Sequence, residues 1–299
     1  MTIVWPRFNR QARMVWYRDY LSWVKNYKSS ILLNFGEPFT NLMALGFGLG
    51  AYVAKMNGDP FIDFIGPGLL MVTAMNAVTF DMGFEGYDRL NESQLYSGMM
   101  SAPILVSEVV GGEMLWEMTR AMLYGGVFFL VLLVLGLVHS WWSVLLPVPL
   151  ALSGMLFGAP ALLVAASARS HEQLFYYFTL VITPLFLFSG VFFPIGRLPH
   201  AVQDIIIALP LYHAVNLGRS LILGQVSLAN IADVLWLALY TAIMLALPAR
   251  VLERRLTSLG PKTVQYPTGI AGGRPHAGGH GTPALAGQAS LPSGQAQGG

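Results

Sequence analysis

The sequence predicts an all-α integral membrane protein with six transmembrane helices. Hydrophobic residues make up 55% of the chain and charged residues 11%, whereas about 25% of residues are charged in a typical soluble domain. Several uncharged runs are about 20 residues long, the length that a helix needs to cross a bilayer. One such run, residues 174–193, is followed by two shorter apolar segments separated by Pro210. Short broken segments of this kind are typical of a re-entrant helical hairpin.

The N-terminal segment, residues 1–30, predicts an amphipathic helix that lies on the membrane surface. Basic and aromatic side chains alternate along it, which is typical of a helix on an anionic membrane face. Nucleic acid is the competing partner for such a stretch, but the stretch leads directly into a span. Membrane lipids are therefore expected as a partner, and nucleic acid is not. The basic residues are Arg7, Arg10, Arg13, Arg18, Lys25 and Lys28.

A six-span membrane domain is expected over residues 31–258. Its third span is longer than a bilayer is thick and starts with several charges, so we expect its first turns to leave the membrane or line an internal cavity. The fourth span carries Gly154 and Gly158, a spacing that lets another helix approach closely. The six expected spans are residues 31–53, 61–80, 103–138, 141–168, 174–193 and 228–247.

The fifth span is expected to bend at Pro184, because proline removes a backbone donor. The broken hairpin that follows, residues 197–225, carries polar side chains that need protein or water around them at membrane depth. These are Gln203, Asp204, His213, Asn216 and Arg219. An even number of spans places both termini on one side of the membrane. Of the 17 Lys and Arg residues, 14 are expected on that side, and three are expected on the other: Lys55, Arg197 and Arg219. That bias predicts that both termini are cytoplasmic and that the hairpin is external.

The tail, residues 259–299, is rich in Gly, Pro, Ala, Gln and Ser. This composition cannot bury enough apolar surface to fold, so the tail is expected to be disordered. His276 and His280 lie four residues apart within it, and a solvated tail is expected there rather than a metal site. The chain has no cysteine, so it offers no thiol nucleophile and no thiolate metal ligand.

An intramembrane charge cluster is expected at Glu113, Glu117 and Arg120. Glu108 precedes it by five residues. Arg120 is three residues from Glu117 and can pair with it. Paired carboxylates can also do acid–base chemistry, but no histidine or nucleophile is set beside them. Structural pairing or contact with a partner is therefore expected, with no catalytic residue and no metal on this chain.

No G-x-x-x-x-G-K-[ST] motif occurs in the sequence. If transport is driven by ATP, ATP-Mg must bind to a separate ATPase subunit, and this chain holds no cofactor of its own. The segment 81–103, a polar break between the second and third spans, is the best candidate for the surface that meets such a subunit, and the family resemblance given below implies that it is the gate and coupling element. It mixes charges with apolar anchors that can sit in a groove of a partner; an ordinary solvated connection is the alternative. Its candidate residues are Tyr87, Asp88, Arg89, Leu90, Leu95, Tyr96 and Met99.

The order of motifs in the C-terminal half resembles the type-2 ABC exporter permeases, and among them those of nodulation lipo-oligosaccharide export and polysaccharide export. The motifs are LFLFSGVFFPIGRLP, which ends the kinked span, and LPLYHAVNLGRSLILG in the hairpin. Glu37-Pro38 followed by GFGLG resembles the first span of the family. The resemblance covers about residues 10–258, and Asn91-Glu92-Ser93 departs from it where the family is often more basic.

The resemblance implies a permease homodimer bound by two ATPase subunits in the bacterial inner membrane. It also implies export of an amphiphilic glycan or glycolipid, with a lipo-oligosaccharide as the first expectation. Aromatic residues of the fifth span are then expected to line the translocation path, with packing and interfacial anchoring as the alternative. They are Tyr176, Tyr177, Phe178 and Phe186.

Two other functions remain open on the sequence. An intramembrane enzyme that modifies a lipid or glycan would need a polar catalytic cluster, but His171 and His213 are expected on opposite faces of the membrane. A secondary transporter also uses broken helices, near the midplane; here the break is expected at the outer rim, and the sequence shows no inverted repeat.

The charge bias gives a testable topology. A reporter active only in the periplasm should be inactive when fused after Leu259 and active when inserted at Arg197, because the cations retain the termini in the cytoplasm. Activity of the reporter fused after Leu259 would show that the chain has the opposite orientation.

Overall fold

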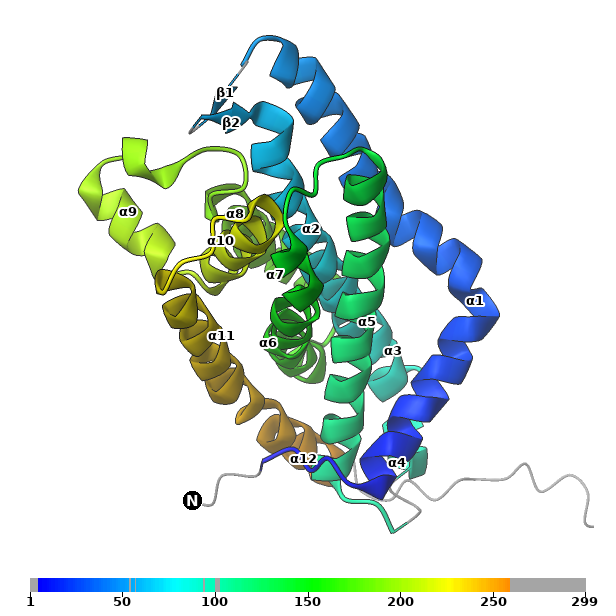
Figure 1. Cartoon of the computed structure of the whole chain (residues 1–299). Helices are drawn as coiled ribbons and strands as arrows, with labels where there is room; N and C mark the ends of the chain where they lie inside the picture. Colours follow the sequence, from blue (N-terminus) through cyan, green and yellow to red (C-terminus); the bar gives the residue numbers. More distant parts are fainter. Residues whose placement is uncertain (1–4, 54, 57, 94, 100–102, 259–299) are drawn as a thin grey trace, which may run out of the picture. The chain divides into compact units, whose positions relative to one another are not determined.

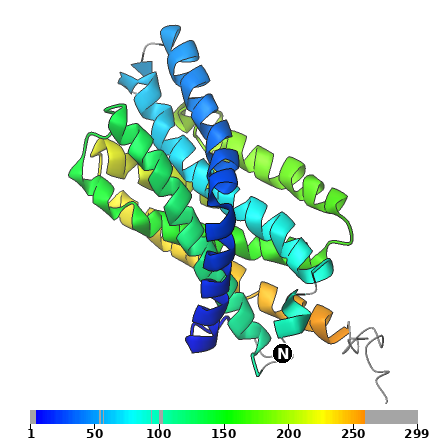
Figure 2. The same ribbon diagram turned by 90° about the vertical axis from the view of Figure 1, so that its right-hand side faces the viewer.

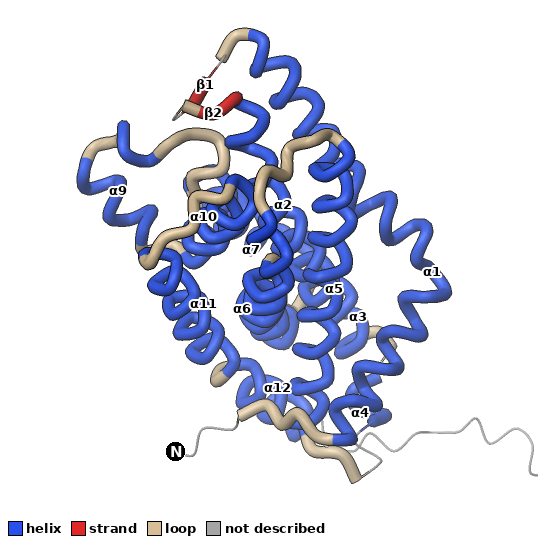
Figure 3. The backbone as a smooth tube through the Cα atoms, in the orientation of Figure 1, coloured by secondary structure: helices blue, strands red, loops and turns tan. Residues whose placement is uncertain are grey.

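The computed structural model describes residues 5–53, 55–56, 58–93, 95–99 and 103–258, and they form a bundle of helices (Figure 1). The expected disordered tail, residues 259–299, lies outside these residues. Figure 3 shows that short loops join the helix ends. The strands in the described part are β1 (Lys55–Met56) and β2 (Asp59–Pro60), a small antiparallel hairpin. It turns at Gly58, whose φ of 97° favours glycine.

Helix α1 (Arg10–Met43) begins at Asn9, whose side-chain oxygen accepts a hydrogen bond from the backbone N–H of Ala12 at 3.2 Å. It ends in a π-helical turn (η1, Ala44–Gly48) and a 3₁₀ turn (η2, Leu49–Ala51). The helix runs without a break through residue 30, where we expected a surface helix to give way to the first span. The expected boundary is therefore not marked by a break in the helix, because no glycine or proline interrupts the chain there. The division into a surface part and a span stays a prediction. Figure 2 shows α1 crossing the bundle along most of its length.

Helix α2 (Phe61–Phe80) continues through a π-helical turn (η3, Asp81–Glu85) into α3 (Gly86–Asn91). The expected break at Asp81 is therefore wrong: the helix ends ten residues later, at Asn91, and Glu92 and Ser93 form a turn. Two of the charges that looked like a loop signal, Asp81 and Arg89, are instead paired with each other inside the protein. The short helix α4 (Leu95–Met99) follows.

Helices α5 (Val106–Val134) and α6 (Pro147–Ser167) follow, with a 3₁₀ turn (η4, Trp141–Leu145) between them. They pack closely at the predicted glycine pair. A Cβ atom added at Gly154 would lie 2.6 Å from the carbonyl oxygen of Glu117, and one at Gly158 would lie 3.0 Å from the Glu117 Cγ. The predicted close approach at these two glycines is confirmed.

The expected fifth span consists of α7 (His171–Tyr177), a π-helical turn (η5, Phe178–Ile182) and α8 (Thr183–Phe188), with Pro184 in the first turn of α8. A 3₁₀ turn (η6, Ile195–Arg197) leads to the broken hairpin, α9 (His200–Ile207) and α10 (Pro210–Leu223), whose axes differ by 84°. The bent hairpin agrees with the sequence.

Arg219 of α10 holds this hairpin against the bundle. Its Nε donates to the carbonyl oxygen of Phe64 at 3.1 Å, and its Nη2 donates to that of Gly190 at 2.9 Å. The guanidinium also lies over the Phe64 ring, 3.8 Å from its centroid. One polar side chain thus links α10, α2 and the loop after α8.

The last helices are α11 (Ala229–Leu245) and α12 (Pro248–Ser258). Among the described residues, four helices are long and apolar enough to cross a membrane, or five if α9 and α10 form one span. They are Phe61–Asn91, Val106–Val134, Pro147–Ser167 and Ala229–Arg255. The two other expected spans fall on α1, which carries many polar residues, and on α7–α8, which begins with the polar residues His171, Glu172 and Gln173. The α2–α3 helix is central, since 89% of its apolar window is buried against 28% in α11–α12.

The α5–α6 contact gives a matched pair of substitutions. Gly154→Ala should lower the free energy of unfolding by about 1–3 kcal/mol, because the new methyl meets backbone that cannot move aside. Gly126→Ala, on α5 with nothing within 4 Å, should be neutral or stabilising because alanine favours helices. Thermal unfolding in detergent measures both, and equal midpoints for the two variants would contradict this packing.

Candidate functional site

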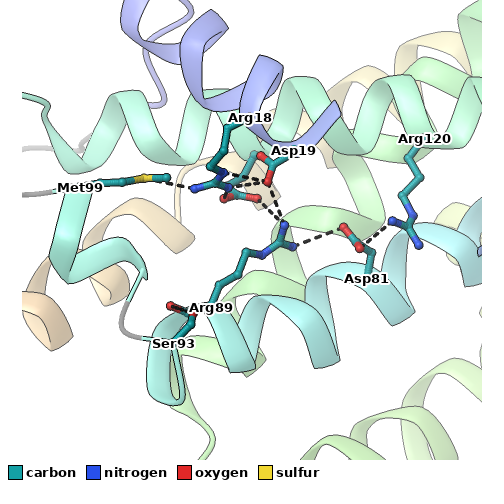
Figure 4. Close-up of polar contacts among 8 residues, drawn as sticks. Arg18, Asp19, Asp81, Arg89, Ser93, Met99 and Arg120 are labelled. Atoms are coloured by element: carbon teal, nitrogen blue, oxygen red, sulfur yellow. Dashed lines mark hydrogen bonds and ion pairs between the residues drawn. The ribbon is translucent and has the colours of Figure 1, made fainter. Parts of the chain in front are cut away.

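Arg89 of α3 lies at the centre of a buried charge network (Figure 4). Its Nη1 is 3.2 Å from the Asp19 Oδ1 and 3.6 Å from the Glu113 Oε2, and its Nη2 is 3.3 Å from the Asp81 Oδ2. Its side chain is only 13% exposed. Arg89, which the sequence placed at the surface that meets an ATPase, therefore joins α1, η3 and α5 inside the chain.

Arg18 of α1 extends the network toward α4. Its Nη2 lies 2.5 Å from the Asp19 Oδ1 and 2.8 Å from the Glu113 Oε1, and its Nη1 lies 3.2 Å from the Met99 sulfur. Burial, followed by the nearby Glu113 carboxylate, raises the pKa of Asp19 to about 7, although Arg89 and Arg18 act in the opposite direction. The basic N-terminal segment thus supplies internal ion pairs as well as surface charge.

Arg120 of α5 pairs with Asp81, with 2.6 Å between its Nη1 and the Asp81 Oδ1. The sequence instead suggested Glu117 as its partner, one turn away on the same helix. Asp81 takes that place because η3 brings it between Arg120 and Arg89, and it accepts from both. Glu117 is fully buried and has no cation partner among the described residues.

The network holds more acid than base. Its guanidinium groups are those of Arg18, Arg89 and Arg120, and its carboxyl groups are those of Asp19, Asp81, Glu85, Glu113 and Glu117. Removing one partner of a buried pair leaves an uncompensated charge, which costs about 3–5 kcal/mol. The network therefore fixes the position of α1 and α3 on α5.

A cavity of about 550 Å³ opens beside this network, between α1, the α2–η3–α3 helix and α5. One wall is a row of polar side chains on α1, here named the polar stripe. Apart from the adjacent Ser29 and Ser30, its members recur every three or four residues, so they share one face of the helix. The polar stripe consists of Ser22, Asn26, Ser29, Ser30, Asn34 and Glu37.

The other walls of the cavity are aromatic and charged. Trp23 and Trp116 contact each other with ring centroids 6.4 Å apart, and Phe80 stacks on Phe84 at 5.8 Å. The charged lining residues are Asp19, Asp81, Glu85, Arg89 and Arg120. Sequence reasoning missed this site, although the spacing of the polar stripe across the start of an apolar run was a signal for it.

The predicted coupling residues lie mostly inside the protein. Tyr87 is 7% exposed, Leu90 2% and Tyr96 0%. Tyr96 packs in a core with Met82, and burial raises the pKa of its hydroxyl well above its usual value. A charged residue at Tyr96 would therefore disrupt the fold, because this side chain is buried within the chain itself. The coupling role of the segment stays a prediction. Asp88 is half-exposed, and Leu95 and Met99 are partly exposed.

The predicted lining residues do not share one surface. Phe178 packs inward, with its ring 4.2 Å from that of Phe80, and Phe186 meets Phe192 edge to face at 4.9 Å. Tyr176 is exposed and Tyr177 is partly buried. Their role in translocation stays a prediction.

Asp88, Glu92 and His171 offer ligand atoms that lie within 4.8 Å of one another and could hold a metal ion. His171 is 2.9 Å from Asp88. His213 belongs to a different cluster, in which its Nδ1 lies 2.8 Å from the Asp233 Oδ1. The two histidines therefore do not form one site, and the tail histidines His276 and His280 lie outside the described residues.

The family model for ABC-2 type transporters matches residues 10–223. The chain belongs to the ABC-2 type transporter family. Nodulation protein J from Rhizobium leguminosarum bv. viciae is 35% identical over 81% of this chain and 93% of its own length. Nodulation protein J from Rhizobium meliloti (strain 1021) is 34% identical over 81% and 92%, respectively. The inner membrane transport permease YadH from Escherichia coli is 25% identical over 59% and 68%. No solved structure matches.

As an ABC-2 type transporter, the chain is the permease subunit of an ABC exporter. The matched region takes in α1, the charge network, the cavity and the broken hairpin. The cavity is thus part of a transport protein, where a polar recess between helices can receive a transported molecule.

The Asp81–Arg120 pair can be tested by a double-mutant cycle. Asp81→Ala should destabilise the permease by about 3–5 kcal/mol, because Arg89 and Arg120 both lose a buried partner. Asp81→Ala combined with Arg120→Ala should cost less than the sum of the single variants. Thermal unfolding in detergent is the measurement, with the exposed Asp204→Ala as the control. Additive single effects would show that the pair is not coupled.

Proposed function

We propose that this permease exports an amphiphilic glycan or glycolipid, with a lipo-oligosaccharide as the leading substrate class. The observation that carries the proposal is the match to nodulation protein J over 93% of that protein's length. The motifs of the hairpin and of the kinked span resemble the same group of exporters. A cavity with both polar and aromatic walls suits a cargo that has hydroxyl groups and apolar faces.

We infer that ATP is bound and hydrolysed by a separate ATPase subunit, since no P-loop motif occurs in this sequence. The docking surface is proposed at the end of the bundle where α3, α6, α7 and α12 meet. Arg255 of α12 ties this helix to α6 and α3: it donates to the carbonyl oxygens of Ala166 and Ala168 at the end of α6 and, at 2.7 Å, to the Asn91 Oδ1. Force applied there would reach Arg89 through α3.

The proposed arrangement in the bacterial inner membrane has six spans and cytoplasmic termini. It counts the second half of α1 and the α7–α8 segment as spans and treats α9–α10 as an external re-entrant hairpin. The cation bias supports the orientation, and the 84° bend with its Arg219 anchor supports the re-entrant form. A homodimer with two ATPase subunits is proposed from the family resemblance.

Export can be tested in reconstituted vesicles. The full chain together with its ATPase should move a fluorescent lipo-oligosaccharide across the bilayer only when ATP-Mg is present. A Walker-motif variant of the ATPase is the control and should abolish movement. Chemical change of the probe by the permease alone would favour the enzyme alternative, and movement driven by an ion gradient without ATP would favour a secondary transporter.

Docking can be tested by reversing exposed charges. Glu92→Arg combined with Asp88→Arg should lower co-purification of the ATPase by about tenfold, which corresponds to about 1.4 kcal/mol. Asp204→Arg is the matched control, because Figure 1 places α9 at the end of the bundle opposite to α4 and α12. Unchanged co-purification in a normally folded double variant would place the docking surface elsewhere.

A further inference from the structure

We propose that Asp88, Glu92 and His171 form a site for a divalent transition-metal ion that joins the end of α3 to the start of α7. The site is separate from the cavity, and the inference does not depend on the proposed export function. It rests on three features: the donor atoms that these residues bring together, a histidine ring held in place by its neighbours, and carboxylates that no cation of the described chain neutralises. Sequence spacing could not indicate this site, because 83 residues separate Asp88 from His171.

The three side chains bring three donor atoms to one point. A carboxylate oxygen of Asp88, one of Glu92 and a ring nitrogen of His171 all lie within 4.8 Å of one another. Asp88 and Glu92 are four residues apart at the end of α3 and so share one face, and His171 begins α7. Bonds of about 2.0–2.2 Å to one ion place neighbouring ligand atoms about 3–3.5 Å apart. Modest rotation of the carboxylates is therefore enough to close the site around an ion.

The packing of His171 directs its ring toward the carboxylates. The ring lies nearly parallel to that of Phe84, with centroids 6.4 Å apart, and meets Tyr87 edge to face at 4.7 Å. Its Nε2 lies 2.9 Å from the Asp88 Oδ1. Metal sites work best when neighbouring groups fix the orientation of each ligand in advance. His171 thus presents one nitrogen to the site and loses little side-chain freedom when an ion binds.

The site has negative charge without a compensating cation. Among the residues that the structure describes, neither Asp88 nor Glu92 forms a salt bridge with a lysine or arginine. Arg89, next to Asp88 in the chain, turns into the buried network, and Arg255 donates to Asn91 and to two carbonyl oxygens. Like charges four residues apart on a helix repel each other, and the C-terminal end of a helix adds partial negative charge. A bound divalent cation would offset both effects.

The donor set decides which class of ion fits. One imidazole nitrogen with two carboxylate oxygens suits Zn²⁺ or Mn²⁺, whereas Mg²⁺ and Ca²⁺ prefer oxygen ligands alone and Cu(I) prefers sulfur. The side chains of Asp88 and His171 are 45% and 44% exposed, so an ion can enter from solvent and water can complete its coordination. An ion bound to both elements would hold α7 against α3.

Zinc binding to the full chain in lipid nanodiscs, measured by isothermal titration calorimetry, tests the proposal. All samples carry His276→Gln and His280→Gln and no polyhistidine tag, because histidines of the tail could bind zinc themselves. One Zn²⁺ should bind per chain, at least about tenfold more tightly than Mg²⁺, and should raise the midpoint of thermal unfolding. Empty nanodiscs give the background. An absence of saturable zinc binding would overturn the proposal.

Single substitutions locate the site. His171→Gln and Glu92→Gln should each weaken zinc binding by about tenfold or more, because each removes one of three ligands. His200→Gln is the matched control, since His200 is an exposed histidine on α9, and it should bind zinc as before. Glu92→Gln leaves the ring packing of His171 intact, so it separates loss of a ligand from loss of local structure. Unchanged affinity in either ligand variant would mean an adventitious ion only and would refute the site.

Hydrogen exchange tests whether the ion joins the two helices. Zinc should slow amide exchange at the end of α3 and in the first turn of α7 together, by at least about threefold, because the ion restrains local opening of both. The same zinc concentration should leave exchange unchanged in His171→Gln. Slower exchange in only one of the two elements, or equal slowing in the variant, would contradict a bridging ion.

Discussion

The ion pairs around Arg89 are the constraint on which the rest of this structure depends. They join a helix that begins near the N-terminus to one that follows the central span and to a third that carries Glu113. Each of these charges is costly to bury alone, and only their combination makes the burial favourable. The cavity lies directly beside them, so its walls keep their spacing only while the pairs remain formed.

Close backbone packing supports the same region from the other side of α5. A Cβ atom at Gly112 would lie 2.5 Å from the Val15 Cβ, and one at Gly154 would meet the Glu117 carbonyl oxygen. Glycines thus let α1 and α6 approach opposite sides of one helix. Along α1 the contact is reinforced by hydrogen bonds from Asn9 to Glu108 and from Trp16 to Thr119.

The sequence predicted the helical class, the second, third and fourth apolar helices, the glycine contact of α6 and the bent hairpin, because these follow from local apolar length and from proline and glycine. It misplaced the end of α2 at Asp81, because a sequence does not distinguish a charge that is paired inside the folded protein from a charge that is exposed to solvent. It paired Arg120 with Glu117 for the same reason, because helical spacing shows only neighbours on the same helix. The buried state of Tyr96 and the polar stripe facing a cavity depend on how α1 crosses the bundle, which no local pattern contains.

The π-helical turn between α2 and α3 carries a consequence for movement. Such a turn holds one residue more than the α-helical turn it replaces, and each residue of an α-helix turns the chain by about 100°. A shift of the extra residue out of η3 would therefore rotate α3 about its own axis relative to α2. Arg89 would swing away from Asp19 and Glu113, and the wall that carries Phe84 and Glu85 would turn with it. A second π-helical turn, η5, lies against this one through the stacked rings of Phe84 and Phe178, 5.3 Å apart. Each of these two turns therefore allows the helix that follows it to rotate when the extra residue moves out of the turn. The two turns lie side by side, so both rotations would occur at the same level of the bundle.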